Sequence, residues 1–294
     1  MLLSSHPKFG KESSYEIIKK HFTTEYSPEG ESNYMGKTWK ILITNDDGID
    51  AKGLKRLAEA ASKYGEVWVV APDGQRSAAS HSLTINDPLD VYPVEWGMEN
   101  VHAFSCTGLP SDCVRIGSKY VMPEEPDVVF SGINNGFNAG ADIQYSATVN
   151  AALDAAICGY PAVAFSEGFL NDPRSSGHGH KVTDEYLPII LKALIDPDPA
   201  GAFREERINT LKAGQVVNVN FPDCAPEECK GIRWNCRVSI DTPYIDYYTV
   251  SAELPRGGKR YTIHWIDRDH ANEGTDLRAL LDSYVAVGIV NNIS

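Results

Sequence analysis

Three polar segments of this chain carry oxygen-bearing side chains that together could hold a hard metal cation. Asp46 and Asp47 supply two adjacent carboxylates, Ser77 supplies a hydroxyl and Asn134 supplies an amide. Carboxylate, hydroxyl and amide oxygens, without a soft sulfur ligand, are typical of Mg²⁺ or Mn²⁺ sites rather than of zinc or copper sites. Neighbouring side chains of an extended strand point to opposite faces, so both aspartates reach one cation only if the backbone turns, which Gly48 allows.

Each of these segments also has an interpretation without chemistry. An Asx turn with a helix cap would explain one of the two aspartates of Asn45–Gly48, but not both. Ser77 alone is an ordinary loop serine, and the glycines and asparagines after residue 131 could merely permit positive φ angles. Taken together, the three segments favour a ligand site over unrelated loops, because each follows a predicted strand and ligands of open α/β sheets bind outside the carboxyl ends of the strands.

The segment that begins at Gly132 is rich in Gly and Asn and leads into a helix that we expect to open at Ser146. Asn134 and Asn138 offer amide oxygens to a cation and N–H groups to an oxyanion. The N-terminus of a helix presents unpaired N–H groups and the positive end of its dipole to an anion. Strand, polar loop and helix N-terminus in this order indicate a site for an anionic ligand such as a phosphate.

Buried strands are expected to precede these segments. The apolar runs that predict them are continuous, as in strands covered on both faces: Trp39–Thr44, Val67–Pro72, Asp127–Ser131 and Pro161–Ser166. A helix is expected over about 51–64, with Asp50 as its N-cap and Gly65 after its end. Strands that alternate with helices predict an α/β fold with a Rossmann-like, largely parallel central sheet flanked by helices.

We expect three regions along the chain. Residues 1–38 are expected to be a polar N-terminal extension, either flexible or loosely docked, and residues 39–222 are expected to form the Rossmann-like catalytic core. Residues 168–180, including His178 and His180, are expected to be loop, and a helix is expected over Glu185–Ile195. Residues 223–294 are expected to form a smaller β-rich C-terminal extension that partly returns to the core and takes part in oligomerisation.

The composition excludes several classes of partner. The chain has 294 residues and a formal net charge of −13, so a stable nucleic-acid partner is not expected. No apolar run approaches the ~20 residues of a membrane span, and the N-terminus does not resemble a secretory signal, so we expect a cytoplasmic protein without a membrane partner. Cys224, Cys229 and Cys236 cluster without zinc-ligand spacing, and we expect neither a zinc nor a redox site there.

Several motifs, in the same order and spacing, closely resemble the SurE family of survival-protein nucleotidases. They cover the chain from about Lys40 to Val290: Ile41–Gly48, Val70–Asp73 with Arg76-Ser77, His81–Thr84, Gly108–Val114, Ser131–Asn134 with Gly136, Asn138, Gly140 and Asp142, and Tyr145–Val149. One departure is Ala147, which stands where the family usually has glycine; its methyl group could crowd a backbone that approaches phosphate.

The resemblance implies a metal-dependent phosphomonoesterase that hydrolyses nucleoside 5′- and 3′-monophosphates, with exopolyphosphatase activity in some members. It assigns one divalent cation, Mg²⁺ or Mn²⁺, to Asp46, Asp47, Ser77 and Asn134. The residues that it assigns to substrate phosphate are Gly48, Asn138, Ser146, Ala147 and Thr148. The residues expected to act in catalysis are Asp46, Asp47, Asn138, Ser146 and Thr148. Family members form homodimers or homotetramers, commonly by exchanging C-terminal segments, and the β-rich C-terminal region here resembles the exchanging segment.

For the mechanism, we expect Asp46 to orient or deprotonate the attacking water, without a covalent phosphoenzyme. Two other functions remain open at this point. The chain could be a nucleotide-binding or nucleotide-sensing module without catalysis, although it lacks the G-x-G-x-x-G and P-loop fingerprints. It could also be a serine hydrolase that uses Ser77 or Ser146 with His81, although neither serine lies in a G-x-S-x-G motif.

Overall fold

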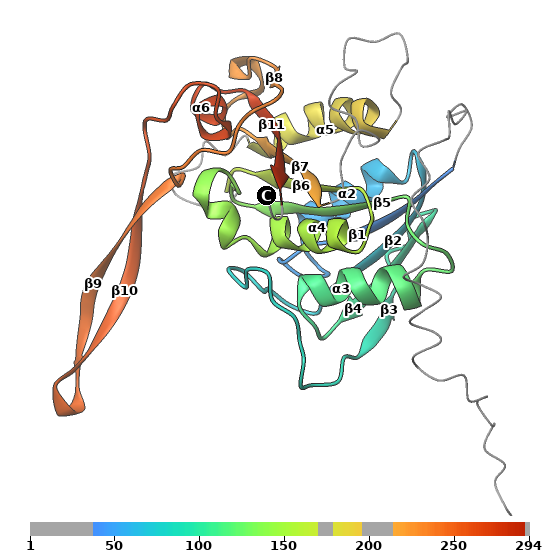
Figure 1. Ribbon diagram of the computed structural model, residues 1–294, viewed down its shortest axis with the longest axis horizontal. Helices are drawn as coiled ribbons and strands as arrows, with labels where there is room; N and C mark the ends of the chain where they lie inside the picture. Colours follow the sequence, from blue (N-terminus) through green and yellow to red (C-terminus); the bar gives the residue numbers. More distant parts are fainter. Residues whose placement is uncertain (1–37, 170–178, 196–213, 292–294) are drawn as a thin grey trace, which may run out of the picture. The chain divides into compact units, whose positions relative to one another are not determined.

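The computed structural model describes residues 38–169, 179–195 and 214–291 (Figure 1). Nine strands of these residues form one sheet in the order β3-β4-β2-β1-β5-β6-β7-β11-β8. Their bounds are β1 Trp39–Thr44, β2 Gly65–Pro72, β3 Val91–Val94, β4 Val101–Cys106, β5 Val128–Asn135, β6 Ala162–Glu167, β7 Gln215–Phe221, β8 Ile232–Arg233 and β11 Val285–Asn291.

The centre of this sheet is parallel. Strands β4, β2, β1, β5, β6 and β7 pair in parallel, whereas β3 and β11 pair antiparallel with β4 and β7. The chain passes from β1 through β2 to β4 on one side and then crosses to β5 on the other side of β1. The gap between the carboxyl ends of β1 and β5 is therefore the topological switch point, where ligands of such sheets bind.

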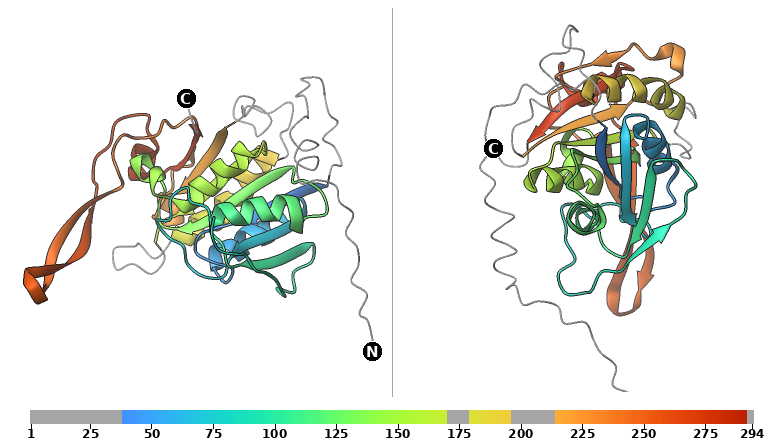
Figure 2. Two further views of the ribbon diagram at one scale, coloured as in Figure 1. Left: turned by 60° about the horizontal axis from the view of Figure 1, so that its bottom comes forward. Right: turned by 90° about the vertical axis from the view of Figure 1, so that its right-hand side faces the viewer.

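Helices cover both faces of the sheet (Figure 2). The bounds of the four that do so are α2 Lys52–Ala61, α3 Pro110–Ile116, α4 Ala147–Ile157 and α5 Gly179–Ile195. Buried side chains of α2 and α5 belong to one apolar cluster, which includes Leu54 and Ile190. Those of α3 and α4 belong to a second cluster, which includes Val114 and Val149. Because both faces are covered, β1 and β2 are buried almost continuously rather than at alternate residues, as expected.

The C-terminal region contributes to the sheet and also forms a separate ribbon. Helix α6, Asp276–Leu281, leads into β11, which pairs with β7 and β8. Strands β9, Tyr244–Leu254, and β10, Gly258–Asp267, form an antiparallel hairpin that is exposed along most of its length (orange in Figure 1). The expected division into regions at residues 38/39 and 222/223 stays a prediction.

Short π- or 3₁₀-helical turns complete the described elements, at η1 Gly117–Val121, η2 Gly140–Gln144, η4 Pro226–Glu228 and η5 Pro255–Gly257. No helix in the described ranges combines the length and the apolar character that a bilayer crossing requires. The six cysteines are free thiols.

Two boundaries of α2 differ from the prediction. Ala51, rather than Asp50, is the N-cap residue of α2, and no side chain caps this helix. The carboxylate of Asp50 lies 3.7 Å from Lys55 instead. Gly65 does not follow the helix end directly but begins β2, where a Cβ atom would lie 2.0 Å from the carbonyl oxygen of Trp39. Glycine is required there by the close approach of β1, which the sequence of the helix does not reveal.

Two further elements are longer than predicted. Strand β5 continues through Gly132 to Asn135, because Asn134 and Asn135 pair with the end of β6 after a shift in register. Helix α5 begins at Gly179, so His180 lies in a helix rather than in the expected loop, and His178 lies outside the described residues. Arg56 donates to the carbonyl oxygen of His180 at 3.0 Å and pairs with Asp184, so tertiary contacts stabilise the first turns of α5.

Candidate active site

The first segment of the site is a tight turn at the carboxyl end of β1. The side chain of Asn45 accepts from the N–H of Gly48 at 3.2 Å and donates to its carbonyl oxygen at 3.1 Å. Gly48 has a φ of 99°, and a Cβ atom on it would lie 3.0 Å from the backbone of Gly74. The side chain of Asn45 therefore closes this turn, and the side chains of Asp46 and Asp47 are not needed for it.

Asp46 is nearly buried, with 4% of its surface exposed, and the Thr148 hydroxyl of α4 donates to its Oδ1. Burial raises the pKa of Asp46 to about 6, an effect that the Thr148 hydrogen bond opposes and the charge of Asp47 increases. The Oδ2 atom of Asp47 accepts from the N–H of Asn135 at 3.1 Å, and burial raises its pKa as well. The turn thus holds two carboxylates at the switch point, each hydrogen-bonded to a different element.

The second segment follows β2 and is fastened to the first. The N–H of Arg76 donates to the carbonyl oxygen of Asp46 at 2.6 Å, and the Gln75 amide donates to the Ser77 hydroxyl at 3.1 Å. Ala78 and Ser80 have φ angles of 56° and 53°, which bend the chain sharply after Ser77. These contacts bring Ser77 to the carboxyl end of β1.

His81 anchors the far end of this segment to α4. Its Nε2 lies 3.1 Å from Oδ1 of the fully buried Asp154, which also receives two hydrogen bonds of 2.8 Å from Arg115. Burial would raise the pKa of Asp154, but the hydrogen bonds from His81 and Arg115 outweigh it and lower that pKa. Among the described residues, no hydrogen bond joins His81 to Ser77 or Ser146. The arrangement therefore lacks the nucleophile–base pair of a serine hydrolase.

The third segment comprises the end of β5 and the loop after it. The amide nitrogen of Asn134 donates to the carbonyl oxygen of Gly136 at 2.8 Å, which leaves the amide oxygen as the acceptor atom of this side chain. The side chain of Asn138 donates to Ser166 at 2.8 Å, and its backbone N–H donates to Asn220 at 2.9 Å. Asn138 is thus fixed by β6 and β7, and one N–H of its amide group remains for a ligand.

Helix α4 begins directly beside these residues. Ser146 is its N-cap, and the Ser146 hydroxyl oxygen accepts from the N–H of Val149 at 3.0 Å. The hydroxyl hydrogen is not used by that bond, so capping and ligand binding are compatible. Ala147 and Thr148, the first two residues of α4, are buried and have N–H groups without an acceptor within the helix.

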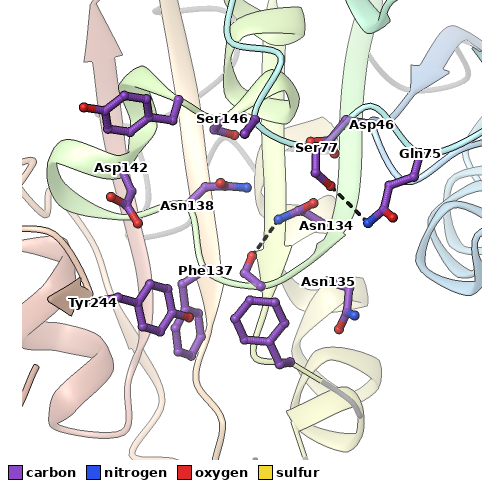
Figure 3. A pocket seen from close by; sticks show the side chains of 14 residues that line it. Asp46, Gln75, Ser77, Asn134, Asn135, Phe137, Asn138, Asp142, Ser146 and Tyr244 are labelled. Atoms are coloured by element: carbon purple, nitrogen blue, oxygen red, sulfur yellow. Dashed lines mark hydrogen bonds between the residues drawn. The ribbon is translucent and has the colours of Figure 1, made fainter. Parts of the chain in front are cut away.

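These segments border one pocket of about 330 Å³ (Figure 3). Five of the residues predicted from the sequence line it: Asp46, Ser77, Asn134, Asn138 and Ser146. Asp47, Gly48, Ala147 and Thr148 are not among its lining residues. In Figure 3, Asp46, Ser77 and Asn134 lie on one side, Asp142 and Tyr244 lie on the opposite side, and Asn138 lies between them.

The pocket also contains residues that the sequence analysis did not assign to the site. They are Gln75, Ala78, Asn135, Gly136, Phe137, Asp142, Tyr145, Phe169 and Tyr244. Burial and the charge of Asp246 raise the pKa of Asp142 to about 6. Asp142 could have been assigned to the site from the sequence, because it is a carboxylate within the Gly- and Asn-rich segment. No local pattern marks Phe169 or Tyr244, because only the fold brings the end of β6 and the start of β9 together.

The donor set fits a hard divalent cation. No Lys, Arg or His of the described residues forms an ion pair with Asp46 or Asp47, and no cationic group is among the main causes of their raised pKa values. A buried carboxylate without such a partner is costly unless a cation neutralises it. No cluster of three or more His, Cys, Asp or Glu side chains with metal-site geometry occurs in the described ranges, so the remaining oxygens would come from Ser77 and Asn134.

Comparison with known proteins identifies the family. Residues 41–242 match the family model described as survival protein SurE. The chain belongs to the SurE family. It is 38% identical to the 5′-nucleotidase SurE of Clostridium botulinum (strain Loch Maree), over 84% of this chain and 90% of that protein. It is 39% identical to the 5′-nucleotidase SurE of Caldanaerobacter subterraneus, over 86% of this chain and 91% of that protein.

A solved structure confirms the fold class predicted for this SurE chain. The crystal structure of the SurE protein from Aquifex aeolicus superimposes with a TM-score of 0.68 at 32% sequence identity. The match covers 86% of this chain and 94% of that chain. The family and the largely parallel, helix-flanked sheet expected from the sequence motifs are both confirmed.

Proposed function

We propose that this SurE protein is an enzyme that hydrolyses nucleoside monophosphates to nucleoside and phosphate. The observation that carries the proposal is the pocket at the switch point, where the buried carboxylate of Asp46 accompanies Ser77 and Asn134 beside the start of α4. The name 5′-nucleotidase, borne by its relatives, supports the reaction class. We propose 5′- and 3′-monophosphates as substrates, with inorganic polyphosphate as a further substrate class.

The proposed metal ligands are Asp46, Asp47, Ser77 and Asn134, and the proposed cation is one Mg²⁺ or Mn²⁺ ion. When bound, such an ion supplies positive charge beside the phosphate and lowers the pKa of water at the site. The donor types support this choice because all four are hard oxygen ligands. Asp47 is held toward the third segment by the N–H of Asn135.

Asp46 is proposed to orient or deprotonate the attacking water. In the metal-free protein, burial raises the pKa of Asp46 to about 6, so its carboxylate is mostly ionised at neutral pH and available to a cation or to the proton of a water molecule. The Thr148 hydroxyl fixes the carboxylate by donating to Oδ1, and the backbone N–H of Thr148 is hydrogen-bonded to the same carboxylate. Thr148 therefore contributes to catalysis by positioning Asp46 in addition to its proposed role beside the phosphate.

The phosphate is proposed to bind at the start of α4. The Ser146 hydroxyl and the free amide N–H of Asn138 would donate to its oxygens, together with the backbone N–H group of Ala147. The backbone N–H of Thr148 is hydrogen-bonded to Asp46 and lowers the pKa of that carboxyl. Gly48 would allow the first segment to approach the phosphate without a side chain in the way. These donors stabilise the negative charge of the transition state, and their fixed positions avoid reorganisation during the reaction.

We propose that the protein is a homodimer or homotetramer that exchanges C-terminal segments through the β9–β10 hairpin. Large apolar side chains of this hairpin are exposed, and they include Tyr248 at 62% and Ile266 at 58%. An exposed apolar ribbon of this size is typical of a protein interface. Sedimentation equilibrium measures the oligomeric state, and a stable monomer would exclude this proposal.

The proposed function is tested by measuring phosphate release from a panel of nucleoside 5′- and 3′-monophosphates and from inorganic polyphosphate. We expect release from the 5′-monophosphates in the presence of Mn²⁺ or Mg²⁺. Tight retention of a nucleotide without release of phosphate, under any of these metals, would instead indicate a non-catalytic nucleotide-binding module. Inhibition by serine-directed reagents would indicate a serine hydrolase.

A further inference from the structure

Asp142 lines the pocket but is neither a proposed metal ligand nor a proposed phosphate donor. It belongs to η2, the turn that leads into α4, and its side chain is half-buried. Figure 3 shows its carboxyl group on the side of the pocket opposite Asp46, with Asn138 between the two. The pocket therefore has a carboxyl group on each side of the position proposed for the phosphate.

Backbone hydrogen bonds hold Asp142 in a fixed position beside the start of α4. The N–H groups of Tyr145 and Ser146 donate to its carbonyl oxygen at 2.9 and 3.2 Å. On the other side, the N–H of Ala141 donates to the carbonyl oxygen of Asp241 at 3.0 Å. Asp142 is thus fixed relative to Ser146, a proposed donor to the substrate phosphate.

The carboxyl group of Asp142 differs from a structural carboxylate of the same region. Asp276 accepts from the N–H groups of Gly140, Ser239 and Leu277 at 2.9, 2.9 and 2.7 Å. Within the described ranges, no hydrogen bond reaches the carboxyl group of Asp142, and no Lys, Arg or His lines the pocket. A structural role would require such partners, because a buried carboxylate is costly without them. The carboxyl group of Asp142 is therefore available to a ligand of the pocket.

The surroundings of Asp142 favour its protonated form. Burial and the charge of Asp246 on β9 raise the pKa of Asp142 to about 6. Asp241, which is also near this segment, is paired with Arg268 at 3.4 Å. A bound phosphate would bring further negative charge close to Asp142 and raise its pKa again. Asp142 can therefore hold a proton near neutral pH when substrate is bound, as a proton donor must.

Hydrolysis of a phosphate monoester needs a proton at the leaving oxygen. The alkoxide of a nucleoside is strongly basic, so it leaves slowly unless a proton is supplied as the bond to phosphorus breaks. In an in-line displacement, the attacking water and the leaving oxygen lie on opposite sides of phosphorus. With the water at Asp46 and the phosphate at Asn138, the leaving oxygen points to the side of the pocket that carries Asp142 (Figure 3).

We propose that Asp142 is the general acid of the hydrolysis and donates its carboxyl proton to the ester oxygen as the bond from that oxygen to phosphorus breaks. This inference rests on the proposed function and adds a catalytic residue to the same site. The electron pair of the broken bond stays on the ester oxygen, which becomes the hydroxyl group of the nucleoside. The water oxygen forms the new bond to phosphorus, and one water proton passes to the carboxylate of Asp46. Loss of that proton to solvent and uptake of another by Asp142 restore the starting state.

The first experiment compares the wild type and Asp142→Asn on three phosphate esters, with Mn²⁺ supplied. They are adenosine 5′-monophosphate, phenyl phosphate and p-nitrophenyl phosphate, in order of decreasing basicity of the leaving group. Asparagine keeps the shape of the side chain but has no carboxyl proton to give, so kcat/KM for the nucleotide should fall about 10²- to 10³-fold. The loss should be smaller for phenyl phosphate and only a few-fold for p-nitrophenyl phosphate, because p-nitrophenolate leaves without a proton. Asp269→Asn, whose side chain is 96% exposed, should match the wild type on all three.

The second experiment measures the pH profile and needs only the nucleotide. The wild-type kcat/KM should decrease as the pH rises through the pKa of Asp142, about 6, and by about tenfold for each pH unit well above it. Asp142→Asn has no proton to lose at this position, so the decrease should be absent. Asp246→Asn removes a like charge and so lowers the pKa of Asp142, and its decrease should begin at a lower pH than in the wild type.

Three outcomes would overturn the inference while leaving the nucleotidase proposal intact. Equal losses on all three esters in Asp142→Asn would indicate a structural role. A loss on the nucleotide without any loss on phenyl phosphate would indicate a contact with the nucleoside. An unchanged decrease at high pH in Asp142→Asn would place the proton donor elsewhere, and this profile decides if the wild type hydrolyses neither aryl ester. Retention of the nucleotide without phosphate release by the wild type would instead overturn the proposed function, and the general acid with it.

Discussion

Replacing Asp46 by asparagine is expected to lower metal-dependent hydrolysis of a nucleoside monophosphate by about 10³-fold or more. Asparagine keeps the shape of the side chain and the oxygen that accepts from Thr148, but it removes the negative charge and the proton acceptor. The variant therefore loses a proposed metal ligand and the proposed base in one step. Steady-state release of phosphate at saturating Mn²⁺ measures the effect.

The matched control for this variant is Asp50→Asn, in the same turn. The Asp50 side chain is 90% exposed and makes only a 3.7 Å ion pair with Lys55, so its activity should remain close to that of the wild type. Circular dichroism and thermal unfolding should show both variants folded. Hydrolysis by Asp46→Asn within a few-fold of the wild type would remove Asp46 from the mechanism, whatever its position in the pocket.

The central architecture was predictable because its physical causes are local in the sequence. Continuous apolar runs mark strands that are covered on both faces, and the bounds of β1 agree with its run, Trp39–Thr44. Ser146 was identifiable as the N-cap of α4 from its residue type and position. Once the strands are parallel, their carboxyl ends share one edge of the sheet, so the convergence of Asp46, Ser77 and Asn134 on one pocket follows from topology.

The differences arise where contacts between distant segments decide the local structure. Helix α5 extends back to Gly179 because Arg56 of α2 binds its first turns, and no residue near Gly179 encodes that partner. Asp50 is a good N-cap by type, yet Ala51 occupies the cap position, after the turn that Asn45 closes by bonding to Gly48. Local propensity is a weak predictor in such places because tertiary contacts outweigh it.

The residues of the site were also predictable only where their positions depend on local sequence. Its polar residues lie next to strand ends in the sequence, whereas Phe169 and Tyr244 meet only in the folded chain. The hydroxyl of Thr148 donates to the buried carboxylate of Asp46, and Thr148 is not among the pocket-lining residues, so its role beside the phosphate stays a prediction. A hydrogen bond between α4 and the end of β1 depends on how the helix packs on the sheet, which the spacing of residues does not specify.

Removal of divalent metal is expected to abolish phosphate release from nucleoside monophosphates, and addition of Mn²⁺ or Mg²⁺ should restore it. Without a cation, two neighbouring carboxylates without a cationic partner in the described part of the chain would repel the substrate phosphate. The measurement is activity after EDTA treatment and desalting, followed by titration with each metal. Ca²⁺, a larger hard cation, and Zn²⁺, which prefers nitrogen and sulfur ligands, serve as comparisons. Full activity after EDTA treatment would contradict the proposed metal site.

The metal concentration needed for activity is also expected to depend on pH, and to increase as the pH falls. Burial raises the pKa of Asp46 in the metal-free protein to about 6, so below that pH a proton competes with the metal for the carboxylate. The metal concentration for half-maximal activity should therefore rise about tenfold for each pH unit below about 6, and it should change little above that pH, up to about pH 8. The rise requires an ionised Asp46 at the metal, because an exposed aspartate would titrate near its ordinary pKa of about 3.9. A half-activating concentration that stays constant down to about pH 5 would place the metal away from Asp46, even if EDTA abolishes activity.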